Sequence, residues 1–174
     1  MNYIVLDLEW NQSADGKAYT NSRIPFEIIQ IGAVKLDENF SEISQFDRYI
    51  RPAVYTKLHD KVQEILNVTI EELTCIGHDF TDVANDFIRW CGDDYIFCTW
   101  GQTDLTELQR NFDYYNIENN IISKLHFTTF FIIIPLFNLN ILTYAINSTF
   151  YKKQNISVTL NYSHILLFFC NILI

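Results

Sequence analysis

The sequence has little that would cross-link the chain or bind a soft metal. Its 174 residues include four cysteines, and no two of them stand in a Cys-x-x-Cys spacing. This excludes a disulfide framework and a cysteine-based zinc site, so we expect buried thiols in a reducing, cytoplasmic compartment. No basic stretch precedes the apolar residues at the N-terminus, and we therefore expect no secretory signal peptide.

An excess of basic residues is also missing. The formal net charge is −9, which argues against a broad basic surface for duplex nucleic acid. All 21 acidic residues lie between Asp7 and Glu118, and residues 125–174 contain no acid and only two lysines. This break in composition divides the chain into an acidic domain, residues 1–124, and an apolar tail, residues 125–174.

Apolar runs in the first part of the chain predict four strands. β-Branched and aromatic residues dominate the segments 3–10, 26–36, 45–50 and 95–100. A polar loop, Asn11–Arg23, separates the first two segments, and a hairpin turn at Asp37–Asn39 follows the second, which is typical of a three-stranded meander. A domain of about 124 residues is long enough to bury a core around such strands.

Helical patterns occupy the stretches around the fourth strand. Thr69 and Glu72 match a capping box, in which a hydroxyl and a glutamate satisfy the first amides of a helix. Apolar residues at helical spacing from Phe80 to Cys91 predict an amphipathic helix that Gly92 closes. Another apolar helical face covers residues 105–115. The order of elements predicts an α/β fold with the first strand at the centre of its sheet.

Two carboxylates one residue apart, Asp7 and Glu9, end the first predicted strand. Residues i and i+2 of a strand point to the same face, roughly 6.5–7 Å apart along the chain. Two adjacent anions repel each other and are costly to desolvate, and a divalent cation between them removes both costs. Oxygen ligands suit Mg²⁺ or Mn²⁺. The alternative is a strand end that turns into solvent.

Asp104 is a third acid of interest because it follows the predicted strand 95–100 and begins a helix. It is either a helix acid favoured by the dipole or part of a site with Asp7 and Glu9. In α/β sheets, functional groups gather at the carboxyl ends of adjacent strands. Three carboxylates that converge there would suit two-metal hydrolysis of a phosphodiester, with the ions about 3.5–4 Å apart.

Four segments, in order and spacing, resemble the DEDD-type 3′–5′ exonucleases, in particular the DnaQ-like branch in which a histidine is the general base. The segments are Ile4–Asn11, Pro25–Val34, Phe46–Pro52 and Thr99–Asp104. The resemblance covers residues 1 to about 120. It implies a ribonuclease H-like mixed sheet flanked by helices, with an atypical or truncated C-terminal third.

The same resemblance implies the cofactor and its ligands. Asp7, Glu9 and Asp104 would hold two Mg²⁺ or Mn²⁺ ions, and the substrate would be the 3′ end of single-stranded DNA or RNA. The sequence indicates no protein partner.

The resemblance also implies contacts with the terminal nucleotide. The backbone around Leu8 and Trp10 would approach it, and Glu27 and Ile28 would line its pocket. Trp10 and Trp100 would stack on a base or belong in part to the core.

The third motif of this branch is missing from the sequence. The family has a histidine as general base and, five residues later, an aspartate as the fourth ligand. His126 and His164 are followed at that distance by Phe131 and Phe169. No catalytic residue is therefore carried over, and we expect impaired hydrolysis.

The apolar tail has three interpretations. Its composition, rich in Ile, Phe, Asn and Tyr, is typical of A-T-rich DNA translated in a wrong frame, with the shift near Lys124. Alternatively, residues 125–146 form a membrane anchor, since about 20 apolar residues span a bilayer, although Pro135 and two asparagines interrupt them. The third interpretation is a divergent tail packed on the sheet.

Three functions follow from these alternatives. The first is a metal-dependent 3′–5′ exonuclease with impaired activity. The second is a non-catalytic nucleic-acid-binding module that keeps the fold. The third is a membrane-anchored variant.

Overall fold

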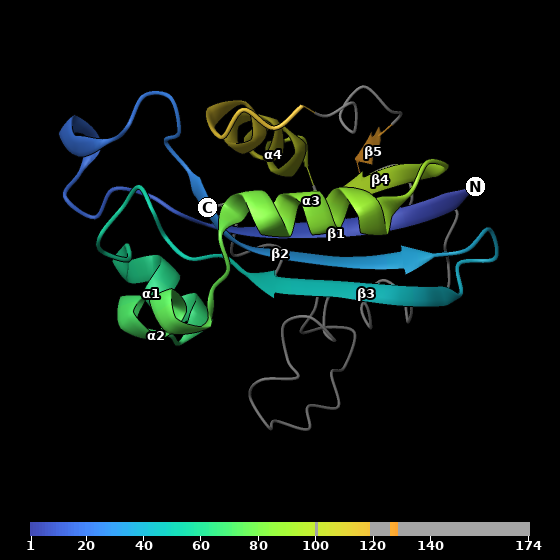
Figure 1. Cartoon of the computed structure of the whole chain (residues 1–174), viewed down its shortest axis with the longest axis horizontal. Coiled ribbons are helices and arrows are strands. Elements are labelled where there is room, and N and C mark those ends of the chain that lie inside the picture. The colour runs from blue at the N-terminus through green and yellow to red at the C-terminus, as the bar shows by residue number, and fades with distance from the viewer. Residues whose placement is uncertain (100, 119–125, 129–174) are drawn as a thin grey trace, which may run out of the picture.

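The computed structural model describes residues 1–99, 101–118 and 126–128 (Figure 1). The strands are β1 (Asn2–Asn11), β2 (Glu27–Leu36), β3 (Glu42–Tyr49), β4 (Tyr95–Thr99) and β5 (His126–Thr128). The helices are α1 (Asp60–Leu66), α2 (Ile70–Ile76), α3 (Phe80–Cys91) and α4 (Thr103–Tyr114), and a single 3₁₀ turn, η1, covers Lys17–Tyr19.

The strands form one mixed sheet in the order β3-β2-β1-β4-β5. The pairs β1–β2 and β2–β3 are antiparallel, as expected for a meander of consecutive strands. The pairs β1–β4 and β4–β5 are parallel. The predicted α/β fold, a mixed sheet flanked by helices with the first strand in the centre, is confirmed.

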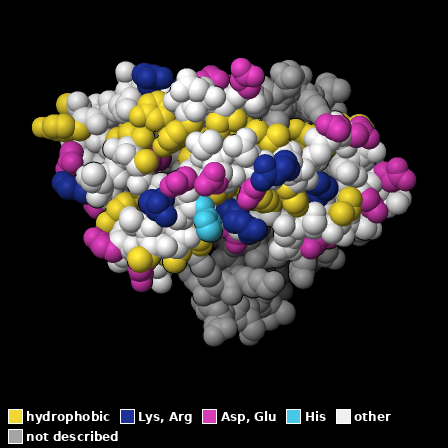
Figure 2. All heavy atoms as spheres, viewed as in Figure 1, with side chains coloured by type: hydrophobic (Ala, Val, Ile, Leu, Met, Phe, Trp, Pro, Cys, Tyr) yellow, Lys and Arg dark blue, Asp and Glu magenta, His cyan; other side chains and the backbone are white. Residues whose placement is uncertain are grey.

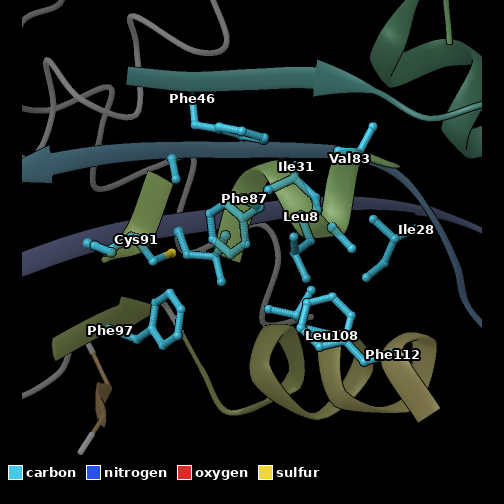
Figure 3. Packing of buried hydrophobic residues seen from close by; sticks show 14 of the residues in the cluster. Leu8, Ile28, Ile31, Phe46, Val83, Phe87, Cys91, Phe97, Leu108 and Phe112 are labelled. Carbon is cyan, nitrogen blue, oxygen red and sulfur yellow. The ribbon is translucent and has the colours of Figure 1, made fainter. Parts of the chain in front are cut away.

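Helices α3 and α4 cover one face of the sheet, where the main core lies (Figures 1 and 3). Leu8 from β1 and Ile31 from β2 meet Phe87 of α3 and Leu108 of α4 in this core. The apolar spacing of α3 predicted its buried stripe, because residues three and four apart share one side of a helix. Phe80, Val83, Ala84, Phe87 and Cys91 are all buried.

The short helices α1 and α2 lie at one end of the sheet (Figure 1). They pack around a smaller apolar cluster in which Ile29, Leu58 and Leu73 are buried. The capping box predicted at the start of α2 is present, with Thr69 and Glu72 each bonding the other's backbone amide. Helix α1 was not predicted, since it is short and buries none of its residues.

The observed bounds differ from the predicted ones at a few places. Strand β3 begins at Glu42 rather than residue 45, because pairing with the long β2 extends it through residues 42–44, none of which is buried. Strand β5 was not predicted at all, and its place in the sheet lies beyond the expected boundary at residue 124. The expectation of buried thiols holds for Cys91 and Cys98 and is wrong for Cys75, which is exposed.

Several predictions fall outside the described residues. They are the stacking role of Trp100, the position of His164, and the three interpretations of the tail from residue 129 onward. Within the part that the structure describes, no helix is long and apolar enough to cross a membrane.

Candidate metal centre

Strand β1 continues past the point where its neighbour β4 ends. Strand β4 pairs with β1 only from Asn2 to Val5, whereas β2 pairs with β1 as far as Asn11. On the side of β4, the second half of β1 thus has no strand partner among the described residues. Helix α4 begins in this place, and the Asp104 carboxylate Oδ1 accepts a hydrogen bond of 3.3 Å from the Leu8 amide.

The carboxylates of Asp7 and Glu9 lie beside this junction. They alternate with Leu6 and Leu8, which are buried in the core under α3 and α4, so Asp7 and Glu9 point to the opposite face of the sheet. Asp7 is exposed and Glu9 half-buried, while Asp104 is buried. The structure thus places the three predicted ligands in one region of the molecule: Asp7 and Glu9 on the second half of β1, and Asp104 at the start of α4, bonded to the Leu8 amide between them.

Loss of hydration raises the pKa of all three groups, and repulsion from neighbouring carboxylates adds to the shift of Glu9 and Asp104. Dense surrounding protein raises the pKa of Asp7 to about 6, although its side chain reaches solvent. The pKa of Glu9 rises to about 7, first through loss of hydration and then through the charges of Asp7 and Asp104. The same causes, loss of hydration and then Asp7, raise the pKa of Asp104 to about 6, against the opposing hydrogen bond from Leu8. Glu9 and Asp104 therefore interact electrostatically with the neighbouring carboxylates.

A consequence is that stability depends on pH and on metal. Because the pKa values are higher in the folded chain than in the unfolded one, these groups favour folding at low pH and oppose it as pH rises through 6–7. We expect Mg²⁺ or Mn²⁺ to raise the unfolding temperature at pH 8 far more than at pH 5, where protons compete with the metal. Thermal unfolding with metal or with EDTA at both values measures this. Equal metal effects at the two pH values would contradict it.

The donor set fits a hard divalent cation. All three side chains supply oxygen, and none of the ion pairs among the described residues neutralises them. In that same part of the chain no three acidic, histidine or cysteine side chains are close enough to form a ready-made ligand group. The side chains thus have the right chemistry for a cation site, but a bound cation would have to draw the three carboxylates closer together.

Leu8 and Trp10, expected near a terminal nucleotide, flank Glu9 on β1. Leu8 is buried, and its backbone amide donates a hydrogen bond to Asp104. Trp10 is half-buried and packs at the edge of the core, with its ring 5.8 Å from that of Phe26. Trp10 therefore belongs in part to the core.

Glu27 and Ile28, expected in a nucleotide pocket, have internal contacts instead. The Glu27 carboxylate is 1% exposed and accepts the amides of Ala53, Val54 and Tyr55 at 2.6, 2.8 and 3.1 Å. Ile28 is fully buried and packs in the main core. Neither side chain offers surface to a nucleotide in this arrangement, which does not support the predicted contact.

Two buried asparagines that the sequence did not single out connect the site to its surroundings. Asn11, at the end of β1, donates to the Lys57 carbonyl at 2.9 Å and accepts the His59 amide at 3.0 Å. Asn111, on α4, bonds the start of β2. Asparagine is a poor helix former, and Asn111 lies on the same side of its helix as the apolar Leu108. This unusual position could have indicated a buried polar contact. Asn11 gave no such signal.

The histidines among the described residues have structural positions. His59 caps α1, where its ring accepts the Lys61 amide. The backbone of His78 bonds Tyr49 and Arg51 beside β3. His126 lies in β5. None of these observations supplies the general base that the resemblance requires.

The face seen in Figure 2 carries interspersed charges. Basic and acidic side chains alternate over its described part, with no continuous basic area. This agrees with the low basic content of the sequence.

One comparison with known proteins identifies a family. The family model RNase_T, described as Exonuclease, matches residues 4–134. The search among curated proteins found no match.

Three of the similar solved structures are nucleases. The nuclease domain of 3'hExo, a DEDDh family member bound to rAMP, is 19% identical with a TM-score of 0.58 over 71% of this chain. Cell-death related nuclease 4 (CRN-4) is 21% identical with a TM-score of 0.55 over 68%. Exonuclease I is 14% identical with a TM-score of 0.60 over 79%.

The alignments span 64%, 41% and 30% of those three chains, so this chain covers less than two thirds of each. At these identities the likeness shows a shared fold, which is the ribonuclease H-like fold of DEDDh-type exonucleases.

Proposed function

Because the chain belongs to the exonuclease family whose model matches residues 4–134, we propose that it hydrolyses phosphodiester bonds at 3′ ends of single-stranded DNA or RNA. The observation that supports this most is the meeting of Asp7, Glu9 and Asp104 where β4 ends beside β1. The charges of Asp7 and Asp104 both raise the pKa of Glu9, and the charge of Asp7 raises that of Asp104, which supports placing the three acids near one another.

Asp7, Glu9 and Asp104 would hold Mg²⁺ or Mn²⁺. When bound, such ions make a coordinated water more acidic and stabilise charge on the leaving oxygen. The protein's own contribution is to place carboxylate ligands from a strand and a helix near each other, in partly dehydrated surroundings. Trp10, next to Glu9, offers a half-buried ring on which the terminal base would stack.

We expect low activity for this chain because the third motif is absent. A positioned general base contributes about 10²–10⁴-fold to the rate. Introducing a histidine and an aspartate at the family spacing should therefore raise activity by orders of magnitude.

Translating the gene beyond codon 124 in the other frames tests the frameshift interpretation, which fails if neither frame encodes that motif.

A non-catalytic nucleic-acid-binding module is the second candidate. It is favoured by the absent third motif and by the open arrangement of the three acids in the described residues. In an acidic chain, affinity for nucleic acid would come mainly from metal ions and the 3′-end pocket, so binding would depend weakly on salt.

One assay separates the two candidates. An oligonucleotide labelled at its 5′ end is incubated with the full chain and Mn²⁺, and a copy with a blocked 3′ end is the control. The exonuclease predicts a ladder shortened from the 3′ end with release of nucleoside monophosphates, and the blocked control stays intact. Binding of the oligonucleotide without any shortening, even at high Mn²⁺, favours the module.

Two further expectations remain proposals. These are the division of the chain at residues 124 and 125, and the cytoplasmic location inferred from the thiols.

A further inference from the structure

Helix α4 is attached to the sheet at two points by side-chain hydrogen bonds. Near its start, Asp104 accepts the amide of Leu8 on β1 at 3.3 Å. Seven residues later, Asn111 Oδ1 accepts the amide of Ile28 on β2 at 3.1 Å. Seven residues are about 10 Å of helix, so the two bonds hold the helix to two different strands at well separated places.

The second attachment lies at an irregularity in the sheet. Glu9 pairs with Gln30, but the next residue, Trp10, pairs with Ile28, so Ile29 is an extra residue of β2. Such a bulge disturbs the hydrogen bonding of the strands. The buried amide of Ile28 needs an acceptor, and Asn111 from α4 supplies it. The bulge adjoins Glu9, one of the three carboxylates.

Asn111 suits this place because it both accepts and donates. Its side chain is fully buried, and Nδ2 donates to the carbonyls of Phe26 and Glu107 at 2.9 and 2.8 Å. A leucine would fill the same space but leave the Ile28 amide without an acceptor. Asn111 thus bonds Ile28 of β2 through its oxygen and Phe26, just before β2, through its nitrogen.

The first attachment is the weaker of the two. The Asp104–Leu8 distance is longer than the usual 2.7–3.2 Å range for an N–H···O bond. Asp104 therefore depends on the placement of its helix more than on its own contact. Asp104 must still lie within reach of Asp7 and Glu9 for a cation to draw the three together, so a shift of α4 away from β1 would weaken cation binding.

We propose that Asn111 is a positioning residue for the cation site. By fixing α4 at the β2 bulge, it keeps Asp104 at the free side of β1 beside Asp7 and Glu9. This inference rests on the proposed function, because it concerns the same three carboxylates. Asn111 itself touches neither metal nor substrate.

The experiment measures Mn²⁺ binding by the full chain, using Mn²⁺ alone as probe and electron paramagnetic resonance of the free ion as readout. Asn111→Ala should weaken Mn²⁺ affinity about tenfold or more, the range found for residues that orient metal ligands. Asn111→Leu keeps the occupied volume and should give the same loss, so it serves if the alanine variant does not fold.

A control of comparable stability loss comes from α3. Val83 is buried in the same core, and Val83→Ala should lower the unfolding temperature without changing Mn²⁺ affinity. Amide resonances supply a second readout. Without metal, the Leu8 amide signal should move in the Asn111 variants, because Asp104 moves with α4, and should stay in place in Val83→Ala.

The outcomes separate the two proposals. Wild-type Mn²⁺ affinity and an unmoved Leu8 amide in the Asn111 variants would overturn the positioning role and leave the proposed function standing. Equal loss of affinity in Val83→Ala would also overturn it, since general loosening would then explain the effect. If the wild-type chain binds no Mn²⁺, the proposed function fails, and the Leu8 amide still tests whether Asn111 places α4.

Discussion

Replacing Asp7 by alanine or asparagine should reduce Mn²⁺-dependent nucleotide release by about 10³-fold, because a metal ion contributes several kcal/mol of charge stabilisation in the transition state. The same variants should be more stable than wild type without metal at pH 8. Removing one of three carboxylates with raised pKa relieves the repulsion among them. Activity is measured on a 3′-ended oligonucleotide, and stability by thermal unfolding in EDTA.

Opposite changes in activity and stability distinguish a lost ligand from a damaged fold. Asp113→Asn is the matched control. Asp113 is an exposed acid at the end of α4 that bonds Gln109, and its replacement should leave both measurements near wild type. Undiminished activity in Asp7→Ala would show that Asp7 holds no essential metal.

Replacing Glu27 by alanine should destabilise the protein by about 3 kcal/mol, because three backbone amides lose their acceptor and each such bond is worth about 1 kcal/mol. Burial raises the pKa of Glu27, and the amides of Ala53, Val54 and Tyr55 partly offset that shift. Glu27→Gln keeps one acceptor oxygen and should lose less. Urea unfolding followed by tryptophan fluorescence measures both.

The control for Glu27 is Glu64→Ala, which removes an exposed acid from α1 and should change stability by no more than about 0.5 kcal/mol. A Glu27→Ala variant as stable as wild type would show that residues 53–55 are held by other contacts. Glu27 would then be free for the nucleotide role first expected of it.

The role of Glu27 shows where sequence reasoning reached its limit. Its position within an apolar run beside Ile28 resembles a family motif, and the resemblance implied a substrate contact. The three amides that bind it come from residues 53–55, more than 25 positions away. Short-range patterns carry no information about which distant amide needs an acceptor, so this function had to come from the tertiary structure.

The strands and long helices were accessible from the sequence for the opposite reason. Period-two and period-3.6 patterns depend on which side of an element faces the core, and that side is visible within ten or twelve residues. The 80–91 helix was predicted to the residue. Helix α1 and strand β5 were missed, because the one has only partly buried apolar residues and the other is three residues long.

The sequence by itself determined the family, the mixed α/β sheet, and the identity of Asp7, Glu9 and Asp104 as the acids of the candidate site. The order of the motifs and the periodicity of apolar residues are local properties of the chain. Only the tertiary structure decided that β4 stops short beside β1 and that Asp104 fills the place it leaves. It also decided that Asn111 attaches the helix at the bulge in β2, because these contacts join residues more than 80 positions apart.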